Sequence, residues 1–430
     1  MAVKTKRFIN ARKSCSCSMP GVWRAVAYSD GAVVIFHSPR ACAHVARSMD
    51  IGSHYRTMAD GSSENHSTVP LLSSQLEEKH SIFGGTEQLE KCIKFAVDTY
   101  QPECIVIANS CVAGVIGDDV EATARKVETM YKIPVLTVDC FGFLDGEYYQ
   151  GYFETAERLI DRFFRPQVQK ADTVLLLGDN GGPWGNYAKE VTRLLAKLGV
   201  RVIGQFPGYM PIDKLKLAAR AEAAVILGGR GQVHTGLIKI AESLKEKFNI
   251  KYVPDVYPVG WNETQKWILA MGELFSCGSK ASKLLADEQE YLQKAKAEFL
   301  PVTAKKKTVL FIGRLLMYFQ PQAVLETINE LQLDLRGIVL LDAYDAKEKE
   351  RMLAAVKACT DVPVSDIAEA DHLLQDANLI LTTHELANKN VKQIFLPMLP
   401  KVGTTGEINF MRAIYRCLSS RIMRGGISYV

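Results

Sequence analysis

The chain has 430 residues, of which 47% are hydrophobic and 23% charged, and its formal net charge is +4. This composition is ordinary for a globular protein of about three domains, and it excludes a fibrous or disordered chain. The small net charge gives no reason to expect nucleic acid as a partner. The first fifteen residues lack the apolar segment of a secretory signal, and no apolar run approaches the ~20 residues that span a bilayer. We therefore expect a cytoplasmic protein with no membrane partner.

Short apolar runs alternate with helical patterns along most of the chain. The runs are continuously apolar rather than alternating, which is typical of parallel strands covered on both faces. Ten such runs predict strands, at residues 32–36, 104–108, 135–138, 173–177, 201–205, 224–227, 308–312, 337–341, 378–381 and 392–396.

Helical patterns fill the intervals between these runs. In residues 86–100, for example, Leu89, Ile93 and Ala96 fall on one helical face. Alternation of strand and helix predicts an α/β fold with three Rossmann-like, doubly wound parallel-sheet domains around a central cleft. Polar stretches near 165–171 and 301–307 place the predicted domains at 1–168, 169–303 and 304–430.

Three of the ten cysteines lie in turn-like segments of the first predicted domain. Reducing compartments disfavour disulfides, so these cysteines are core thiols, catalytic thiols or metal ligands. Cys17 lies in a loop ahead of the first strand, and Cys42 and Cys111 each follow a strand, at the sheet edge where ligands bind. The helical pattern after each is expected to lower the thiol pKa and favour the metal-binding thiolate. We interpret the three as metal ligands.

The remaining cysteines of this domain give weaker signals. Cys92 lies on a helical core face and Cys104 begins a strand, so both are interpreted as core residues. Cys140 ends a predicted strand at the same sheet edge, and Cys15 lies two residues before Cys17, so both are reserve ligands. The chain has no CxxC pair, no HExxH, and no Walker A or GxGxxG sequence after a strand, which excludes zinc-ribbon, thioredoxin and nucleotide-loop interpretations.

With these segments the chain resembles component 1 of nitrogenase and its relatives. That family includes the molybdenum–iron protein subunits, cofactor-assembly scaffolds, the protochlorophyllide and chlorophyllide reductases, and a reductive cyclase of coenzyme synthesis. The two first cysteines are 25 residues apart, as in the family, and the third has the family's Ile-Gly-Asp-Asp context. The segments that carry the resemblance are Cys17-Ser18-Met19-Pro20-Gly21, His37-Ser38-Pro39-Arg40-Ala41-Cys42, Ile82-Phe83-Gly84-Gly85, Cys111 through Ile116-Gly117-Asp118-Asp119, and the stretch 176–204.

Carried over, the resemblance implies that Cys17, Cys42 and Cys111 ligate an electron-relay iron–sulfur cluster at a subunit interface. The cluster would be a [4Fe–4S] or a P-cluster type. A cubane cluster normally has four protein ligands, so one is missing. It could come from a partner chain (a sister subunit or a second copy), from Cys15 or Cys140, or be replaced by a larger shared cluster. We favour the partner chain. The resemblance also implies an ATP-dependent homodimeric iron protein as electron donor.

Two departures from the family pattern concern a second cofactor. The family's catalytic subunit anchors its iron–molybdenum cofactor through a cysteine in the middle domain and a histidine in the third. This chain has Gly228 and Leu399 in the matching stretches, so the standard anchors are missing. Backbone N–H groups of Gly228 and Gly229, with Arg230, would instead suit an anionic ligand such as a tetrapyrrole carboxylate. The alternative is a simple strand-to-helix turn.

These observations favour a subunit of a nitrogenase-like two-component reductase, which passes electrons to a substrate in the interdomain cleft. The sequence does not name the substrate. The alternative is a non-catalytic scaffold, or a sister subunit of one, for metallocluster assembly. A third hypothesis, a plain α/β binding protein or transferase with structural cysteines, leaves the Ile-Gly-Asp-Asp segment unexplained.

Overall fold

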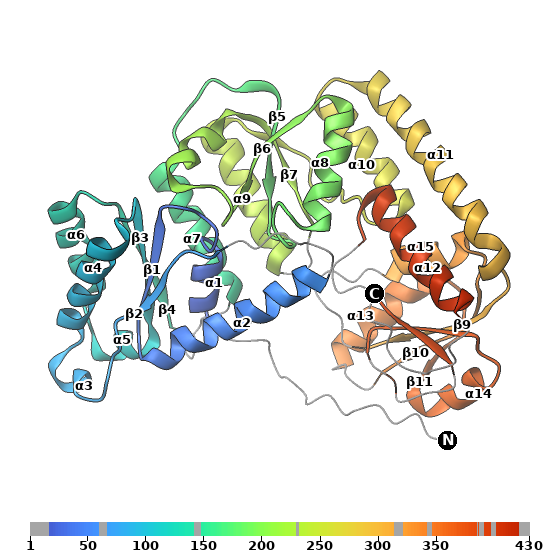
Figure 1. Cartoon of the computed structure of the whole chain (residues 1–430), viewed down its shortest axis with the longest axis horizontal. Helices are drawn as coiled ribbons and strands as arrows, with labels where there is room; N and C mark the ends of the chain where they lie inside the picture. Colours follow the sequence, from blue (N-terminus) through green and yellow to red (C-terminus); the bar gives the residue numbers. More distant parts are fainter. Residues whose placement is uncertain are drawn as a thin grey trace. The chain divides into compact units, whose positions relative to one another are not determined.

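The computed structural model describes residues 17–59, 67–141, 148–228, 232–313, 321–341, 346–384, 386, 391–396 and 401–420. Three parallel sheets flanked by helices make up the chain (Figure 1). This confirms the predicted α/β class with three doubly wound parallel sheets. None of the helices in the described part of the chain is long and apolar enough to cross a membrane.

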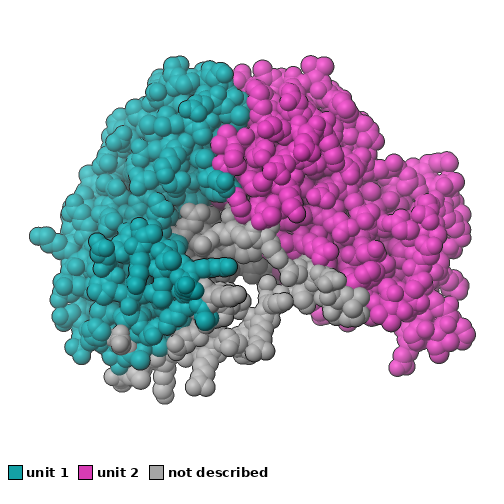
Figure 2. Space-filling model, turned by 180° about the vertical axis from the view of Figure 1, so that it is seen from behind, with its two compact units in different colours: residues 1–12, 189–199, 255–430 teal, residues 13–188, 200–254 magenta. Residues whose placement is uncertain are grey.

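The chain divides into two compact units, which Figure 2 colours separately. Residues 13–188 and 200–254 form one unit, which holds the first two sheets. Residues 1–12, 189–199 and 255–430 form the other, which holds the third sheet. The boundaries predicted after residues 168 and 303 fall between the sheets and stay a prediction.

The first sheet has the strand order β2-β1-β3-β4, and all its strands are parallel. Every residue of β1 and β3 is buried, as their continuous apolar sequences require. Helices α4 and α6 cover one face through Leu89, Ile93 and Val120, while α1 and α7 pack on the other. Its elements are α1 (Met19–Arg24), β1 (Ala32–His37), α2 (Arg40–Ala59), β2 (Leu71–Ser73), α3 (His80–Phe83), α4 (Thr86–Tyr100), β3 (Cys104–Ser110), α5 (Cys111–Ile116), α6 (Val120–Tyr131), β4 (Val135–Cys140) and α7 (Tyr148–Phe163).

The second sheet has the order β6-β5-β7-β8 and is also parallel. Its central strand, β5, ends in five consecutive buried residues. Its elements are β5 (Lys170–Leu177), α8 (Asn186–Leu198), β6 (Arg201–Phe206), η1 (Ile212–Arg220), β7 (Ala221–Ile226), α9 (Gln232–Phe248) and β8 (Lys251–Tyr252).

The third sheet has the order β11-β10-β9-β12-β13. Alternate residues of β9 enter two separate cores: Leu310 packs with α11, α12 and α15, whereas Phe311 packs with α14. Elements of this unit are α10 (Trp261–Leu274), α11 (Gly278–Thr303), β9 (Lys307–Ile312), α12 (Pro321–Glu330), β10 (Asp334–Leu340), α13 (Ala346–Lys357), β11 (Val364–Asp366), η2 (Ile367–Glu369), α14 (Ala370–Leu374), β12 (Leu379–Thr382), β13 (Lys392–Phe395) and α15 (Gly403–Ser419).

Two glycines let helices α1 and α7 touch backbone to backbone. A Cβ on Gly21 would lie 1.9 Å from the Tyr148 carbonyl oxygen, and one on Gly151 would lie 2.3 Å from the Ser18 carbonyl oxygen. No side chain fits at either position without moving a helix. This contact fixes the start of α1, and with it the segment that carries Cys17.

Candidate metal centre

Cys42 and Cys111 lie on either side of the point where the first sheet reverses its winding. From β1 the chain crosses to β2 on one side, and from β3 it crosses to β4 on the other. Cys42 is the third residue of α2, which follows β1, and Cys111 is the first residue of α5, which follows β3. In open parallel sheets this switch point is where ligands bind. Both cysteines are partly buried, so they are accessible without lying on an open surface.

Cys17 and Cys140 belong to the same edge of the sheet. Cys140 is the last residue of β4 and pairs in register with Ser110, the residue before Cys111. Cys17 and Cys111 both contribute to raising the pKa of Cys140, and Cys111 contributes to raising that of Cys42. The structure thus places Cys42, Cys111 and the reserve candidate Cys140 at one edge of the first sheet, with Cys17 near enough to influence Cys140. The other reserve candidate, Cys15, lies outside the described residues.

The expected lowering of the Cys42 pKa is wrong. Burial raises the pKa of the Cys42 thiol, and the hydrogen bond with Ser38 offsets only part of that effect. Burial likewise raises the pKa of Cys140, whose thiol donates to the Val138 carbonyl oxygen at 3.6 Å. Desolvation of the thiolate therefore outweighs the position of Cys42 near a helix start. The Cys42 thiol holds its proton near neutral pH, and metal binding would release it.

The other two cysteines of the domain are core residues, as predicted. Cys104 is fully buried at the start of β3. Cys92 packs against the cluster formed by β1, β3, α4 and α6, and burial raises its pKa to about 12. Within the described ranges, no three His, Cys, Asp or Glu side chains converge closely enough to hold a metal ion. Thiol donors are nevertheless the chemistry that suits iron–sulfur clusters.

The Ile-Gly-Asp-Asp segment after Cys111 has a separate structural role for each of its last three residues. Gly117 ends α5 with φ +83°, a conformation that favours glycine. Asp119 caps α6, because its carboxylate accepts the Ala122 N–H at 2.8 Å. Asp118 points inward, and its side chain is only 3% exposed.

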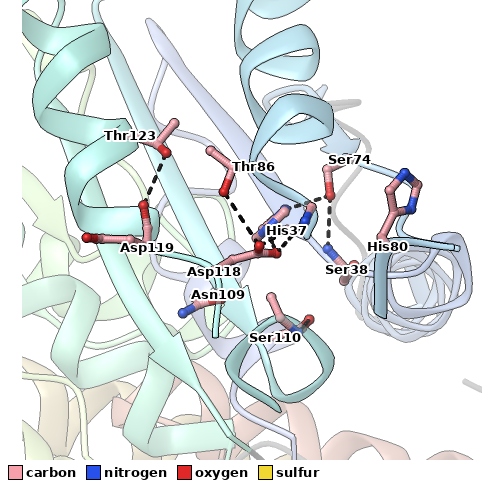
Figure 3. Close-up of polar contacts among 12 residues, drawn as sticks. His37, Ser38, Ser74, His80, Thr86, Asn109, Ser110, Asp118, Asp119 and Thr123 are labelled. Carbon is pink, nitrogen blue, oxygen red and sulfur yellow. Dashed lines mark hydrogen bonds and ion pairs between the residues drawn. The ribbon is translucent and has the colours of Figure 1, made fainter. Parts of the chain in front are cut away.

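The Asp118 carboxylate joins three loops at the switch point (Figure 3). It lies 3.0 Å from Nε2 of His37, at the end of β1, and accepts the Gly85 N–H at 2.8 Å and 3.1 Å. Nδ1 of His37 lies 2.9 Å from the Ser74 hydroxyl. Burial lowers the pKa of His37 despite the neighbouring carboxylate. The sequence indicates His37, Gly85 and Asp118 as family residues without a role for them, and it gives no signal for Ser74, because residues far apart in the chain make these contacts.

The middle-sheet site predicted at Gly228, Gly229 and Arg230 is described only at its first residue. Gly228 follows β7 with φ +78°. The Asn180 side-chain amide donates to the Leu227 carbonyl and lies 3.5 Å from that of Gly228. Gly229 and Arg230 lie outside the described residues, as does Leu399, so the anion site stays a prediction.

The glycine-rich turn after β5 holds an ion pair that the sequence did not predict. Asp179 binds the Arg24 guanidinium through two hydrogen bonds, of 2.7 Å and 2.8 Å, and Arg24 also donates to the Tyr209 hydroxyl at 2.7 Å. Tyr209 in turn donates to Asp179. A Cβ on Gly182 would meet the Tyr209 ring at 2.6 Å. This turn is therefore packed against Tyr209, and it ties α1 to the second sheet.

The sequence is similar to known proteins over most of its length. Residues 17–418 match the family described as nitrogenase component 1 type oxidoreductase. The chain is 25% identical over 447 residues to the nitrogenase iron-molybdenum cofactor biosynthesis protein NifE of a Nostoc species, covering 96% of this chain and 87% of that protein. It is 26% identical over 327 residues to the nitrogenase molybdenum-iron protein alpha chain of Acidithiobacillus ferridurans, covering 70% of this chain and 64% of that one.

A solved structure, nitrogenase Cp1 at pH 6.5, superposes with a TM-score of 0.66 over 98% of this chain and 92% of that chain. The two are 17% identical, so this likeness bears on the fold alone. The family match, in contrast, extends from the first described cysteine to the last helix. The chain belongs to the nitrogenase component 1 type oxidoreductase family.

Proposed function

We propose that this chain is a subunit of a nitrogenase-like two-component reductase in which Cys17, Cys42 and Cys111 hold an iron–sulfur cluster. The observation that supports the proposal is the position of Cys42 and Cys111 on either side of the switch point of the first sheet, with Cys17 in the segment just before α1. When bound, such a cluster accepts and passes on single electrons. The chain's own residues would hold it in a partly buried site and exclude most water from it, which sets its potential.

Three cysteines leave one ligand to be supplied, and a partner chain remains our preferred source. Cys140 is fully buried and bonded to its own strand, which favours a core thiol. A sister subunit or second copy would complete a [4Fe–4S] or larger P-type cluster at the interface. A cluster that assembles fully on monomeric chain and is lost in Cys140→Ser would instead assign the fourth ligand to Cys140.

Iron binding tests the proposal directly. Chain purified without oxygen is expected to carry iron and sulfide, and Cys42→Ala or Cys111→Ala is expected to reduce bound iron to background. Cys92→Ala is the matched control, since Cys92 is a thiol of the same domain that packs on the core of the sheet. A colourless, iron-free wild-type chain after cluster reconstitution would refute the proposal. So would full iron content in Cys111→Ala.

An exposed apolar patch beside the cysteines would suit the iron protein as a partner. Ile82 and Phe83 of α3 are 78% and 84% exposed, and Val115 of α5 is 74% exposed. Helices α3 and α5 pack against each other, so these side chains share one surface. Large exposed apolar groups in one place are typical of protein docking sites. This surface lies at the sheet edge that carries Cys111.

Removal of Phe83 is expected to weaken docking. An exposed aromatic anchor contributes about 2 kcal/mol to binding, so Phe83→Ala should weaken association with the cognate iron protein roughly thirty-fold. Phe95→Ala is the control, because Phe95 is 52% exposed on α4 and contacts Tyr100 rather than the patch. The measurement is nucleotide-dependent complex formation by analytical ultracentrifugation. Equal affinities for the two variants would exclude this surface.

A second candidate function is a scaffold for metallocluster assembly. It is favoured by the similarity to a cofactor biosynthesis protein over 96% of this chain. The missing cofactor anchor at Gly228 weighs against a standard cofactor scaffold but is compatible with a sister subunit of one. The two functions differ in turnover. A reductase subunit is expected to oxidise and re-reduce its cluster repeatedly with iron protein and ATP. A scaffold is expected to release a cluster or precursor to an acceptor protein once.

If the chain is a reductase subunit, the middle sheet would bind the substrate that accepts the electrons. We infer that backbone N–H groups of Gly228 and Gly229, with Arg230, bind an anionic substrate group such as a tetrapyrrole carboxylate. Arg230→Ala is expected to raise the dissociation constant for a carboxylated tetrapyrrole. The same change would leave iron content intact, which separates this site from the cluster site.

A further inference from the structure

Asp118 links the loop before Cys42 to the loop after Cys111. It lies seven residues after Cys111, and its partner His37 lies five residues before Cys42. A third loop enters through Gly85, which opens α4 and donates its N–H to both carboxylate oxygens. The Thr86 hydroxyl lies 3.5 Å from the same carboxylate (Figure 3). One side chain thus sets the relative position of three loops.

Two glycines allow the loop before α4 to approach Asp118 closely. A Cβ on Gly85 would lie 2.6 Å from Asp118 Oδ2 and 2.4 Å from a Leu76 methyl group. Gly84, with φ +79°, would place a Cβ 3.3 Å from Asp118 Oδ1. Gly85 is therefore required by the close approach of Asp118 and Leu76, whereas Gly84 is favoured by its positive φ. Three of the segments that carry the family resemblance thus meet at the buried Asp118 carboxylate.

The pattern of donors fixes the histidine tautomer. The carboxylate accepts, so Nε2 of His37 carries the proton, and Nδ1 accepts from the Ser74 hydroxyl. The Ser74 oxygen in turn accepts the Ser38 N–H at 3.2 Å, in the loop that leads to Cys42. A chain of hydrogen bonds therefore runs from Asp118 through His37 and Ser74 to the backbone before Cys42.

Ser74, His37 and Asp118 are connected in the order of a hydrolase triad, but they cannot act as one. His37 is fully buried and Ser74 is 4% exposed. The Ser74 oxygen is also occupied by the Ser38 N–H. A substrate carbonyl could not reach this hydroxyl. The hydrogen-bonding groups of Ser74, His37 and Asp118 are paired with one another and with nearby backbone. We therefore interpret the network as structural.

We propose that Asp118 is the positioning residue that holds the Cys42 and Cys111 loops in ligand-ready register before any cluster is bound. The positioning role of Asp118 rests on the proposed function only for the identity of the group that the cysteines bind. Residues that orient metal ligands through hydrogen bonds typically change metal affinity 10–100-fold when they are removed. Asp118 acts at both cysteine loops at once, through His37 on one side and through its own chain on the other.

The neighbouring aspartate provides a matched control. Asp118→Ala removes the acceptor for Gly85 and His37, whereas Asp119→Ala removes only the cap of α6. Asp118→Asn is the rescue variant. Its amide oxygen can accept from Gly85 and its NH₂ group can donate to Nε2, with the His37 proton moved to Nδ1 and donated to Ser74.

Hydrogen exchange of the cluster-free chain tests the positioning itself. Asp118→Ala is expected to speed exchange in peptides covering 38–42 and 84–86 by about tenfold or more, since those amides lose their support. Peptides covering 120–131 should be unchanged. Asp119→Ala should give the opposite pattern, and Asp118→Asn should resemble the wild type. If Asp118→Ala does not fold, His37→Gln removes the imidazole link alone and should affect only the 38–42 peptide.

Cluster reconstitution gives the second readout. Asp118→Ala is expected to bind about tenfold less iron, and to shift the reduction potential of what it binds, whereas Asp119→Ala and Asp118→Asn keep wild-type values. Wild-type exchange rates in Asp118→Ala, or equal iron loss in Asp118→Ala and Asp119→Ala, would overturn the proposal. A wild-type chain that takes up no iron would refute the cluster instead, and the exchange experiment would still decide whether Asp118 positions the loops.

Discussion

Asp179→Ala is expected to lower the free energy of unfolding by about 3–5 kcal/mol, because it leaves the Arg24 guanidinium buried without its carboxylate. The Arg24 side chain is 12% exposed and that of Asp179 27%. Their pairing holds the pKa of Asp179 below its ordinary value, although burial opposes this. Arg24 also lies over the rings of Tyr28 and Tyr209, which stack on each other. The loss should be measured by urea denaturation with tryptophan fluorescence, for which Trp23 and Trp184 are local reporters.

Two further variants separate the pair from a general effect of losing an aspartate. Asp98 pairs with Lys94 at 2.6 Å, but both side chains are more than half exposed, so Asp98→Ala should cost less than about 1 kcal/mol. Replacement of both Arg24 and Asp179 by leucine should recover much of the loss, because no unpaired charge is left buried. If Asp179→Ala costs no more than Asp98→Ala, this ion pair does not anchor α1.

Anchoring of α1 connects this prediction to the candidate metal centre. Cys17 lies two residues before α1, and Arg24 is the last residue of that helix. The start of the helix is held against α7 through Gly21, and its end is held by Asp179. Cys17 is therefore positioned by tertiary contacts at both ends of the short helix that follows it.

Glu407→Gln is expected to stabilise the protein at pH 8 by up to roughly 3 kcal/mol and to change nothing near pH 4.5. Glu407 is 3% exposed, and burial raises its pKa to about 7. The carboxylates of Glu326 and Glu330 on α12 raise it further, while the Thr327 hydroxyl, which donates at 2.6 Å, lowers it. Lys296 is paired with Glu330 and offers Glu407 no counter-ion.

The direction of the effect follows from the two pKa values. Below the ordinary glutamate pKa of about 4.5 both states are protonated, so Glu407 costs nothing. Between pH 4.5 and about 7 the folded state keeps a proton that the unfolded state has lost, so stability falls as pH rises. Above pH 7 the full cost remains. Glutamine keeps the oxygen that accepts from Thr327 and cannot ionise, so it lacks this cost.

Melting temperatures measured from pH 4.5 to 8.5 would check this prediction. The wild-type and Glu407→Gln curves should coincide at the acid end and separate above pH 5. Glu298→Gln is the control, since Glu298 is an exposed glutamate of the same unit. Parallel curves for wild type and Glu407→Gln would show that Glu407 ionises as it does in solvent.

The sequence alone was sufficient to predict the main strands and the sheet edge at which Cys42 and Cys111 lie. All ten predicted strands are present, with β5, β7 and β10 each beginning three residues earlier than expected. Continuous apolar runs must be buried on both faces, and parallel strands direct their carboxyl ends to one edge, so Cys42 and Cys111 had to lie near each other. The short edge strands β2, β8 and β11 were missed, because two or three residues show no period and pair only through a neighbour's backbone.

Only the tertiary structure decided the direction of the pKa shift of the candidate ligand Cys42 and the contacts that support the candidate site. The pKa of Cys42 depends on burial by segments elsewhere in the chain, which a local helix pattern cannot report. Asp118 meets His37 across 81 residues, and Arg24 meets Asp179 across 155. The sequence shows which residues can donate, accept or carry charge. Which of them meet is set by the packing of the sheets, because a buried polar group needs a partner wherever in the chain that partner lies.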